Sequence, residues 1–221
     1  GFDIKRPEAV PFGIAKTEFS PALSDAEVRA DLLARCGAPE DAQLLVTVSR
    51  FHPEKRLGTL LEAFALASRD QPMGLVIFGD GPLRAWVNRK ASRIRGVHVA
   101  GFTKDREELA ASLASADAML HGSSAETYGL VVAEAICSGL PLVVPDVGGA
   151  ADLADPTWAE TYPPGDAAAC AAAIDRVHAR DRADLTDALA RAARDRIGTM
   201  DDHFDGLFAL YERLVAERRG S

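Results

Sequence analysis

Short runs of apolar, often β-branched residues alternate along this chain with longer segments in which apolar residues recur every three or four positions. The short runs are typical of buried strands, and the longer pattern is typical of amphipathic helices. We therefore predict strands at 44–49, 73–78, 97–100, 118–121 and 142–144, with an edge strand near 160–162. Helices are predicted at 25–36, 57–68, 82–94, 105–115 and 129–138, in a short segment after Gly149 and through most of 166–219.

Strands that alternate with helices indicate an α/β fold, a Rossmann-like parallel sheet with helices on both faces. The chain has 221 residues with 48% hydrophobic composition, enough to bury one good core. The segment 176–196, in which Arg alternates with Asp, is expected to form a solvated helix face.

Gly79 and Gly81 follow a predicted strand and precede a predicted helix, as the glycines of dinucleotide-binding sites do. The third glycine of that fingerprint would stand where this chain has Arg84, and no acidic residue ends the strand 97–100 to bind a ribose. The two glycines therefore predict a tight turn, and they do not favour a nicotinamide or flavin site.

Two carboxylates eight positions apart are the strongest functional signal in the chain. Glu126 stands in the loop before a predicted helix, and Glu134 lies within that otherwise apolar helix. Because an unpaired buried carboxylate is costly, and because anions bind at helix N-termini beyond the strands of parallel sheets, we expect a ligand there. The alternative is that Glu134 is an ordinary helix acid and Glu126 an ordinary acid at a helix N-terminus.

Arg50 and Lys55 lie in the loop that follows the strand 44–49 and precedes the helix 57–68. Two cations on the carboxyl side of a strand can bind two phosphates. The alternative is a solvated charge cluster in which Glu54 neutralises Lys55 and nothing is bound.

Together these residues resemble a known family. The stretch from Glu126 to Glu134, followed by Ser138-Gly139-x-Pro141 and by Gly148-Gly149, is similar to the retaining glycosyltransferases of family 4. The resemblance implies an enzyme of the GT-B arrangement, with two Rossmann-like halves, that transfers a hexosyl group from a UDP-, GDP- or ADP-sugar to an acceptor hydroxyl. These motifs belong to the carboxyl-terminal, donor-binding half of such enzymes.

The resemblance also implies roles for individual residues. Glu126 would face the donor sugar and Glu134 the nucleotide ribose, while Arg50 and Lys55 would bind the diphosphate and stabilise its leaving-group charge. Retention would proceed by front-side displacement, without a side-chain nucleophile. The other residues expected to contact the donor are Thr127, Tyr128, Gly129, Leu130, Gly101, Phe102, His121 and Gly13.

Three of these assignments have alternatives or departures from the family pattern. Phe102 fits a core position as well as a contact with the base, and His121 could be a satisfied loop histidine. Gly13 belongs to a segment similar to the family's interdomain segment, in which Ala15 replaces the usual Asp. We therefore expect an interdomain segment at 1–24, a nucleotide-sugar-binding domain with C-terminal helices at 25–221, and an acceptor domain that is absent from this chain.

Two other functions would fit the same architecture. One is a GT-B enzyme of another reaction class, such as a nucleotide-sugar epimerase or a phosphorylase. The other is a catalytically silent nucleotide-binding or assembly module.

Charge and composition limit the partners. The formal net charge of −8 gives no global attraction for nucleic acid or for anionic lipid, and no apolar run is long enough to insert into a membrane. The three cysteines are far apart, as expected for reduced core thiols, and without an Asp-x-Asp pair we expect neither metal nor cofactor. We expect a cytoplasmic enzyme, with any peripheral contact to the inner membrane face made by the missing half.

Overall fold

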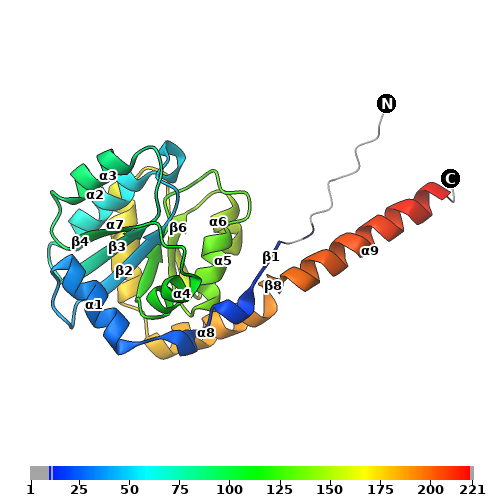
Figure 1. Cartoon of the computed structure of the whole chain (residues 1–221), viewed down its shortest axis with the longest axis horizontal. Helices are drawn as coiled ribbons and strands as arrows, with labels where there is room; N and C mark the ends of the chain where they lie inside the picture. The colour runs from blue at the N-terminus through cyan, green and yellow to red at the C-terminus, as the bar shows by residue number, and fades with distance from the viewer. Residues whose placement is uncertain (1–9, 11, 220–221) are drawn as a thin grey trace.

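The computed structural model describes residues 10 and 12–219, so predictions for residues 1–9 and Pro11 lie outside the described part. Its centre is a six-stranded parallel sheet with helices on both faces, as the sequence predicts (Figure 1). The strands of this sheet are β2 (Gln43–Val48), β3 (Met73–Phe78), β4 (Val97–Gly101), β5 (Ala118–Leu120), β6 (Leu142–Pro145) and β7 (Ala159–Tyr162).

The strand order is β4-β3-β2-β5-β6-β7. The chain builds outward from β2 to β4, returns to the other side of β2, and builds outward again from β5 to β7. β2 and β5 pair through Leu45 with Ala118 and Val46 with Met119, so the direction of growth reverses between these two strands. In an open parallel sheet such a reversal leaves a crevice beyond the carboxyl ends of the strands, where ligands bind.

Helices cover both faces because successive strand residues point to opposite sides. Along β2, Leu44 and Val46 enter one core and Leu45 enters the other. The first core is covered by α1 (Ala26–Cys36), α4 (Arg106–Ala114), α5 (Leu130–Cys137), α6 (Gly149–Leu153) and α8 (Arg182–Asp195). The second is covered by α2 (Leu57–Ala67), α3 (Arg84–Ala91) and α7 (Ala167–His178).

Aspartate side chains fix the starts of α1, α4, α7 and α8. Each accepts a hydrogen bond from at least one backbone N–H of the first turn, and the residues are Asp25, Asp105, Asp166 and Asp181. Such a cap contributes about 1 kcal/mol to helix stability. The starts of α1, α4 and α7 fall within one residue of the sequence prediction, whereas the start of α8 was not predicted, because the sequence indicated one helical region through most of 166–219.

The segment 176–196 differs from the predicted solvated helix face. It is divided between the end of α7 and α8, and α8 buries Leu185, Ala188 and Leu189 in the first core. These apolar residues recur at helical spacing between the charges, so α8 is amphipathic. The predicted helical region after it is interrupted by β8 (Gly198–Thr199), which pairs with β1 (Gly13–Ile14).

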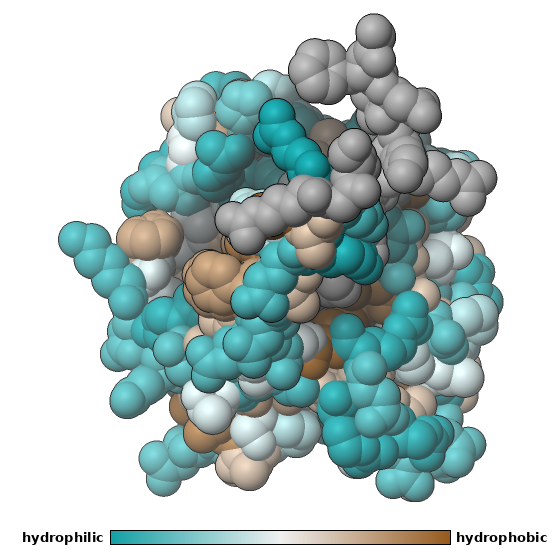
Figure 2. Space-filling model, turned by 90° about the vertical axis from the view of Figure 1, so that its right-hand side faces the viewer, coloured by the Kyte–Doolittle hydropathy of each residue, from teal (hydrophilic) through white to brown (hydrophobic). Residues whose placement is uncertain are grey.

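After β8, the helix α9 (Met200–Arg219) extends away from the body of the domain (Figure 1). It carries exposed apolar side chains, including Phe204, Phe208 and Tyr211. Figure 2 shows this side of the molecule, where hydrophobic surface interrupts a mostly hydrophilic face. Among the described residues, no helix combines the length and the apolar character needed to cross a membrane.

A buried tyrosine connects the carboxyl ends of β5 and β7. Tyr162, the last residue of β7, donates a 2.7 Å hydrogen bond from Oη to the carbonyl of His121, the residue that follows β5. Both residues are buried. The bond therefore holds the start of the loop that carries Glu126.

We predict that Tyr162→Phe lowers the free energy of unfolding by about 1 kcal/mol or somewhat more, because the buried His121 carbonyl loses its side-chain donor. Urea unfolding checks the value. Tyr128→Phe is the matched control, since the Tyr128 hydroxyl is buried without a hydrogen-bond partner among the described residues, and its removal should not destabilise the fold. Equal losses in the two variants would contradict the assignment.

Candidate functional site

A cavity of about 690 Å³ opens beyond the carboxyl ends of β2, β3 and β5, at the point where the sheet order reverses. The structure brings ten of the predicted site residues into its lining: Arg50, Lys55, Phe102, His121, Glu126, Thr127, Tyr128, Gly129, Leu130 and Glu134. The two remaining predicted residues, Gly13 and Gly101, are buried beside it, and their chain neighbours Phe12 and Phe102 line it instead.

The loops after β2 and β5 meet at this cavity. A 3₁₀ turn (Pro53–Lys55) ends the first loop, and Gly122 in the second packs against it. A Cβ on Gly122 would lie 2.5 Å from the carbonyl oxygen of Lys55, so only glycine permits this approach. As a result, Lys55 Nζ reaches Glu126 Oε2 at 2.5 Å.

Glu126 is held as a carboxylate. The imidazole of His121 and the ammonium of Lys55 lower the pKa of Glu126 to about 2, against the opposing effect of burial. His121 Nε2 lies 3.6 Å from Glu126 Oε2, which is too long for a hydrogen bond, so the direct bond is the one from Lys55. At neutral pH Glu126 can therefore accept hydrogen bonds but cannot donate them.

His121 is buried rather than placed in an exposed loop. Its Nε2 has no hydrogen-bond partner among the described residues and faces Glu126. Buried polar groups are nearly always hydrogen-bonded, so an unpaired buried nitrogen is unusual. The alternative of a satisfied loop histidine is wrong for this nitrogen.

The N-terminus of α5 points into the same cavity. Gly129 precedes the helix with φ 86°, and no side chain caps the first turn. The Gly129 carbonyl accepts hydrogen bonds from Val132 and Ala133, which leaves the N–H groups of Leu130 and Val131 free of partners in the described structure. Free N–H groups and the positive end of the helix dipole favour an anion here.

Glu134 lies one turn further along α5, and only 13% of its side chain is exposed. Burial raises the pKa of Glu134, and the guanidinium of Arg106 opposes that rise. Arg106 Nη2 is 3.1 Å from Glu134 Oε1, while its Nε binds Glu18 at 2.5 Å. Glu134 therefore has an ionic partner within the chain, which sequence reasoning missed because Arg106 lies 28 positions away on another helix.

Arg50 and Lys55 have different surroundings. Arg50 is 79% exposed and lies 3.5 Å from Glu54, which also binds His52 at 2.9 Å. The alternative in which Glu54 neutralises Lys55 is wrong, since Lys55 pairs with Glu126 instead. Lys55 is thus fixed at the cavity, whereas Arg50 reaches it from an exposed loop.

Aromatic side chains form the outer wall of the cavity. Phe102 is 66% exposed and lines the cavity, so the alternative of a core residue is wrong. Phe12 and Tyr128 stand with ring centroids 6.1 Å apart, and Phe12 was not among the predicted residues. No motif identifies Phe12, because only the pairing of β1 with β8 brings it to this place.

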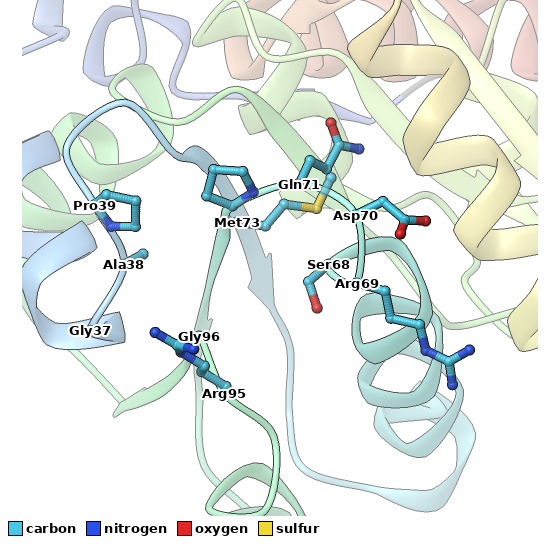
Figure 3. A pocket seen from close by; sticks show the side chains of 11 residues that line it. Gly37, Ala38, Pro39, Ser68, Arg69, Asp70, Gln71, Met73, Arg95 and Gly96 are labelled. Atoms are coloured by element: carbon cyan, nitrogen blue, oxygen red, sulfur yellow. The ribbon is translucent and has the colours of Figure 1, made fainter.

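A second cavity, of about 380 Å³, lies at the opposite end of the sheet (Figure 3). Its lining includes Met73, which begins β3, and Gly96, which precedes β4. It therefore opens at the amino ends of the strands, away from Lys55 and Glu126. Parallel sheets bind ligands at their carboxyl ends, so we assign the functional site to the first cavity.

The family model described as glycosyl transferases group 1 matches residues 29–196. The chain belongs to this family. The matched region contains the predicted site residues from Arg50 to Glu134 and the whole six-stranded sheet.

The similar proteins are considerably longer than this chain. A Mycobacterium tuberculosis protein described as a GDP-mannose-dependent alpha-(1-6)-phosphatidylinositol dimannoside mannosyltransferase is 37% identical over 136 residues, 61% of this chain and 34% of that protein. The structure of sucrose-phosphate synthase from Thermosynechococcus elongatus has a TM-score of 0.76 and 27% identity, covering 95% of this chain and 53% of that one. Anabaena HepE, solved with UDP and glucose, has a TM-score of 0.70 and 21% identity, covering 87% of this chain and 55% of that one. This chain thus spans about a third of the curated relative and about half of each solved structure.

Other chemistry can be assessed within the described residues of this family member. They contain no group of three or more His, Cys, Asp or Glu side chains placed to hold a metal ion. Cys36, Cys137 and Cys170 are free and buried, and burial raises the pKa of each thiol to about 11 or 12. These cysteines are core thiols, as predicted.

We predict that Glu126→Gln weakens the acid sensitivity of the fold. The pKa of Glu126 is lowered from 4.5 to about 2 in the native state, so its stabilising effect is complete above about pH 4.5 and is lost as the pH falls towards 2. Urea unfolding at pH 7, 4 and 3 should show a smaller loss in the variant than in the unaltered chain. Lys55→Met should raise the pKa of Glu126 in the native state and so narrow the pH range over which the stabilising effect of Glu126 is lost. Identical pH dependence in all three proteins would contradict this account.

Proposed function

We propose that this chain is the donor-binding half of a retaining, metal-independent glycosyltransferase of the family 4 type. It would hold a nucleoside diphosphate sugar while a hexosyl group moves to an acceptor hydroxyl. The observation that carries the proposal is the convergence of the Lys55–Glu126 pair, the free N-terminus of α5 and Glu134 on one cavity at the reversal of the sheet. Membership of the glycosyl transferase group 1 family supports it.

The cavity offers different chemistry to each part of such a donor. The free N–H groups at the start of α5, with Lys55 and the exposed side chain of Arg50, suit the diphosphate. Glu126 is an acceptor for sugar hydroxyls, and Glu134 is an acceptor for the ribose. The exposed ring of Phe102 provides a surface for the base.

In the proposed reaction, the bond from the acceptor oxygen to the anomeric carbon forms on the face from which the phosphate leaves. The anomeric carbon–oxygen bond to the diphosphate breaks, and the acceptor proton passes to the leaving phosphate oxygen. No side chain of this chain is assigned as nucleophile. Lys55, Arg50 and the α5 N-terminus would stabilise the negative charge that develops on the diphosphate.

The acceptor site and the full activity are assigned to sequence beyond this domain. The M. tuberculosis relative matches over only 34% of its length, and the two structural neighbours over 53% and 55% of theirs. We therefore expect the 221-residue chain to bind the donor nucleotide and to transfer no sugar at a useful rate, because the positioning of two reactants supplies roughly 7–11 kcal/mol of such a barrier.

The choice of donor is open to direct test. The mannosyltransferase relative is described as GDP-mannose-dependent, and the Anabaena neighbour was solved with UDP and glucose. A thermal-shift panel of GDP, UDP, ADP and their sugars should give one base a clear preference, since ligand at 100 times its Kd adds about 2.7 kcal/mol of stability. The absence of any shift would favour a silent assembly module. Conversion of the sugar nucleotide into its epimer, in the absence of an acceptor, would favour an epimerase.

We predict that Lys55→Ala weakens binding of the preferred nucleoside diphosphate by roughly 1.5–3 kcal/mol, with little effect on the matching nucleoside. Arg50→Ala should act in the same direction but less strongly, because Arg50 is far more exposed. Lys90→Ala is the control, since Lys90 pairs with Glu62 outside the cavity. Calorimetry measures all four proteins. Equal losses for nucleoside and diphosphate would show that Lys55 and Arg50 do not contact the phosphates.

We predict a different split for the two carboxylates. Glu134→Ala should weaken binding of the free nucleotide and of the sugar nucleotide alike, because both contain the ribose. Glu126→Ala should weaken mainly the sugar nucleotide, because Glu126 faces the sugar. Calorimetric Kd values for GDP and GDP-mannose, or for UDP and UDP-glucose, measure the split. The same pattern of losses in both variants would contradict the assignment of Glu134 to the ribose and of Glu126 to the sugar.

A further inference from the structure

Arg106 stands between two carboxylates that belong to different elements. Its Nε lies 2.5 Å from Glu18 Oε2, in the 3₁₀ turn Lys16–Glu18, and its Nη2 lies 3.1 Å from Glu134 Oε1, on α5. The guanidinium therefore joins the segment after β1 to the carboxylate at the cavity. Arg106 itself is not in the cavity lining.

The helix start fixes the backbone of Arg106, and two contacts hold its side chain. It is the first residue of α4, next to Asp105, whose carboxylate accepts the N–H groups of Glu107 and Glu108. The buried ring of Phe19 lies below the guanidinium, at 5.1 Å from its Cζ to the ring centroid. The aromatic face and the carboxylate of Glu18 hold the half-exposed guanidinium on one side, so it can orient its second partner, Glu134.

The contact with Arg106 uses only one oxygen of Glu134. Oε1 accepts the hydrogen bond, whereas Oε2 has no hydrogen bond to another described residue. Glu134 sits on a helix whose neighbouring residues are Val132, Ala133, Ala135 and Ile136, all of them buried. Without Arg106 the carboxylate would lack both its counter-charge and its fixed orientation.

We propose that Arg106 is a positioning residue for the donor site: it holds Glu134 with one carboxylate oxygen free to accept the ribose hydroxyls of the nucleotide. This inference rests on the proposed function, because it assumes a nucleotide in the cavity. Arg106 acts through Glu134 and does not touch the nucleotide. Glu18 completes the arrangement by fixing the other side of the guanidinium.

The electrostatic surroundings make the effect measurable through pH. The groups that face Glu134 are Arg106 on α4, Glu18 on the turn after β1 and Cys137 on α5, with Lys16 acting in turn on Cys137. Burial raises the pKa of Glu134 and Arg106 opposes that rise, so loss of Arg106 would raise the pKa further. As the pH is lowered, Glu134 should then become protonated, and the nucleotide affinity should be lost, at a higher pH than in the unaltered chain.

The test measures binding of GDP and of 2′,3′-dideoxy-GDP by calorimetry, with UDP and ADP and their dideoxy forms in parallel. We expect Arg106→Gln to weaken the ribonucleotide by about tenfold and to leave the dideoxy nucleotide unchanged. Arg106→Lys should restore part of the loss. When the pH is lowered, the ribonucleotide affinity of Arg106→Gln should also begin to fall at a higher pH than the affinity of the unaltered chain.

The chain offers a control pair that is matched in exposure, although its carboxylate, Glu160, has a second ionic partner in Arg180. Arg176 and Glu160 have side-chain exposures of 51% and 14%, compared with 52% and 13% for Arg106 and Glu134, and Glu160 does not line the cavity. Arg176→Gln should leave both affinities unchanged. Circular dichroism and melting temperatures identify any variant that fails to fold. If Arg106→Gln fails to fold, Arg106→Lys is compared with the unaltered chain instead.

Two results would overturn the inference in different ways. Equal losses for the ribonucleotide and the dideoxy nucleotide, or tighter binding by Arg106→Gln, would refute the positioning role alone. If none of the three ribonucleotides bound to the unaltered chain, the proposed function would fail, and this inference with it.

Discussion

The ion pair between Lys55 and Glu126 joins the two loops on which the cavity depends. Lys55 follows β2 and Glu126 follows β5, the strands between which the sheet order reverses. Gly122 lets the two loops touch, and the N–H of Gly149 donates to the Glu126 carbonyl at 2.8 Å. Both side chains are largely shielded from water, where an ion pair is stronger than on an open surface. The loops are thus placed by contacts within the protein itself, which is the condition for a preorganised site.

Much of this arrangement could be predicted from the sequence because it follows from strand positions. Apolar runs locate the strands, and residues at their carboxyl ends must meet at one edge of a parallel sheet. Arg50, Lys55, His121 and Glu126 are all within seven positions of a strand end, so their convergence required no knowledge of side-chain contacts. The asymmetry between Lys55 and Arg50 could not be predicted, because it depends on which neighbouring carboxylate each side chain reaches.

The partner of Glu134 could not be predicted for a related reason. Arg106 opens a helix that looks from its sequence like any surface helix, and only the tertiary arrangement of α4, α5 and the turn after β1 brings it to Glu134. Phe12 reaches the cavity through the pairing of β1 with β8, two strands of two residues each that no periodicity reveals. Contacts between distant elements depend on packing geometry, and a local pattern carries no record of that geometry.

The cations of the cavity are already balanced by carboxylates, which changes where its attraction for an anion comes from. Lys55 is neutralised by Glu126, and Arg50 lies near Glu54. The backbone N–H groups at the start of α5 have no such partner in the described structure. Under the proposed function, the diphosphate would bind to this helix end, and Lys55 would add to its binding because an ammonium group has three N–H donors and Glu126 accepts only one of them. Under the same proposal, a ligand that carries both phosphate and hydroxyl groups would use the free N–H groups and the carboxylate of Glu126 together, which phosphate alone could not do.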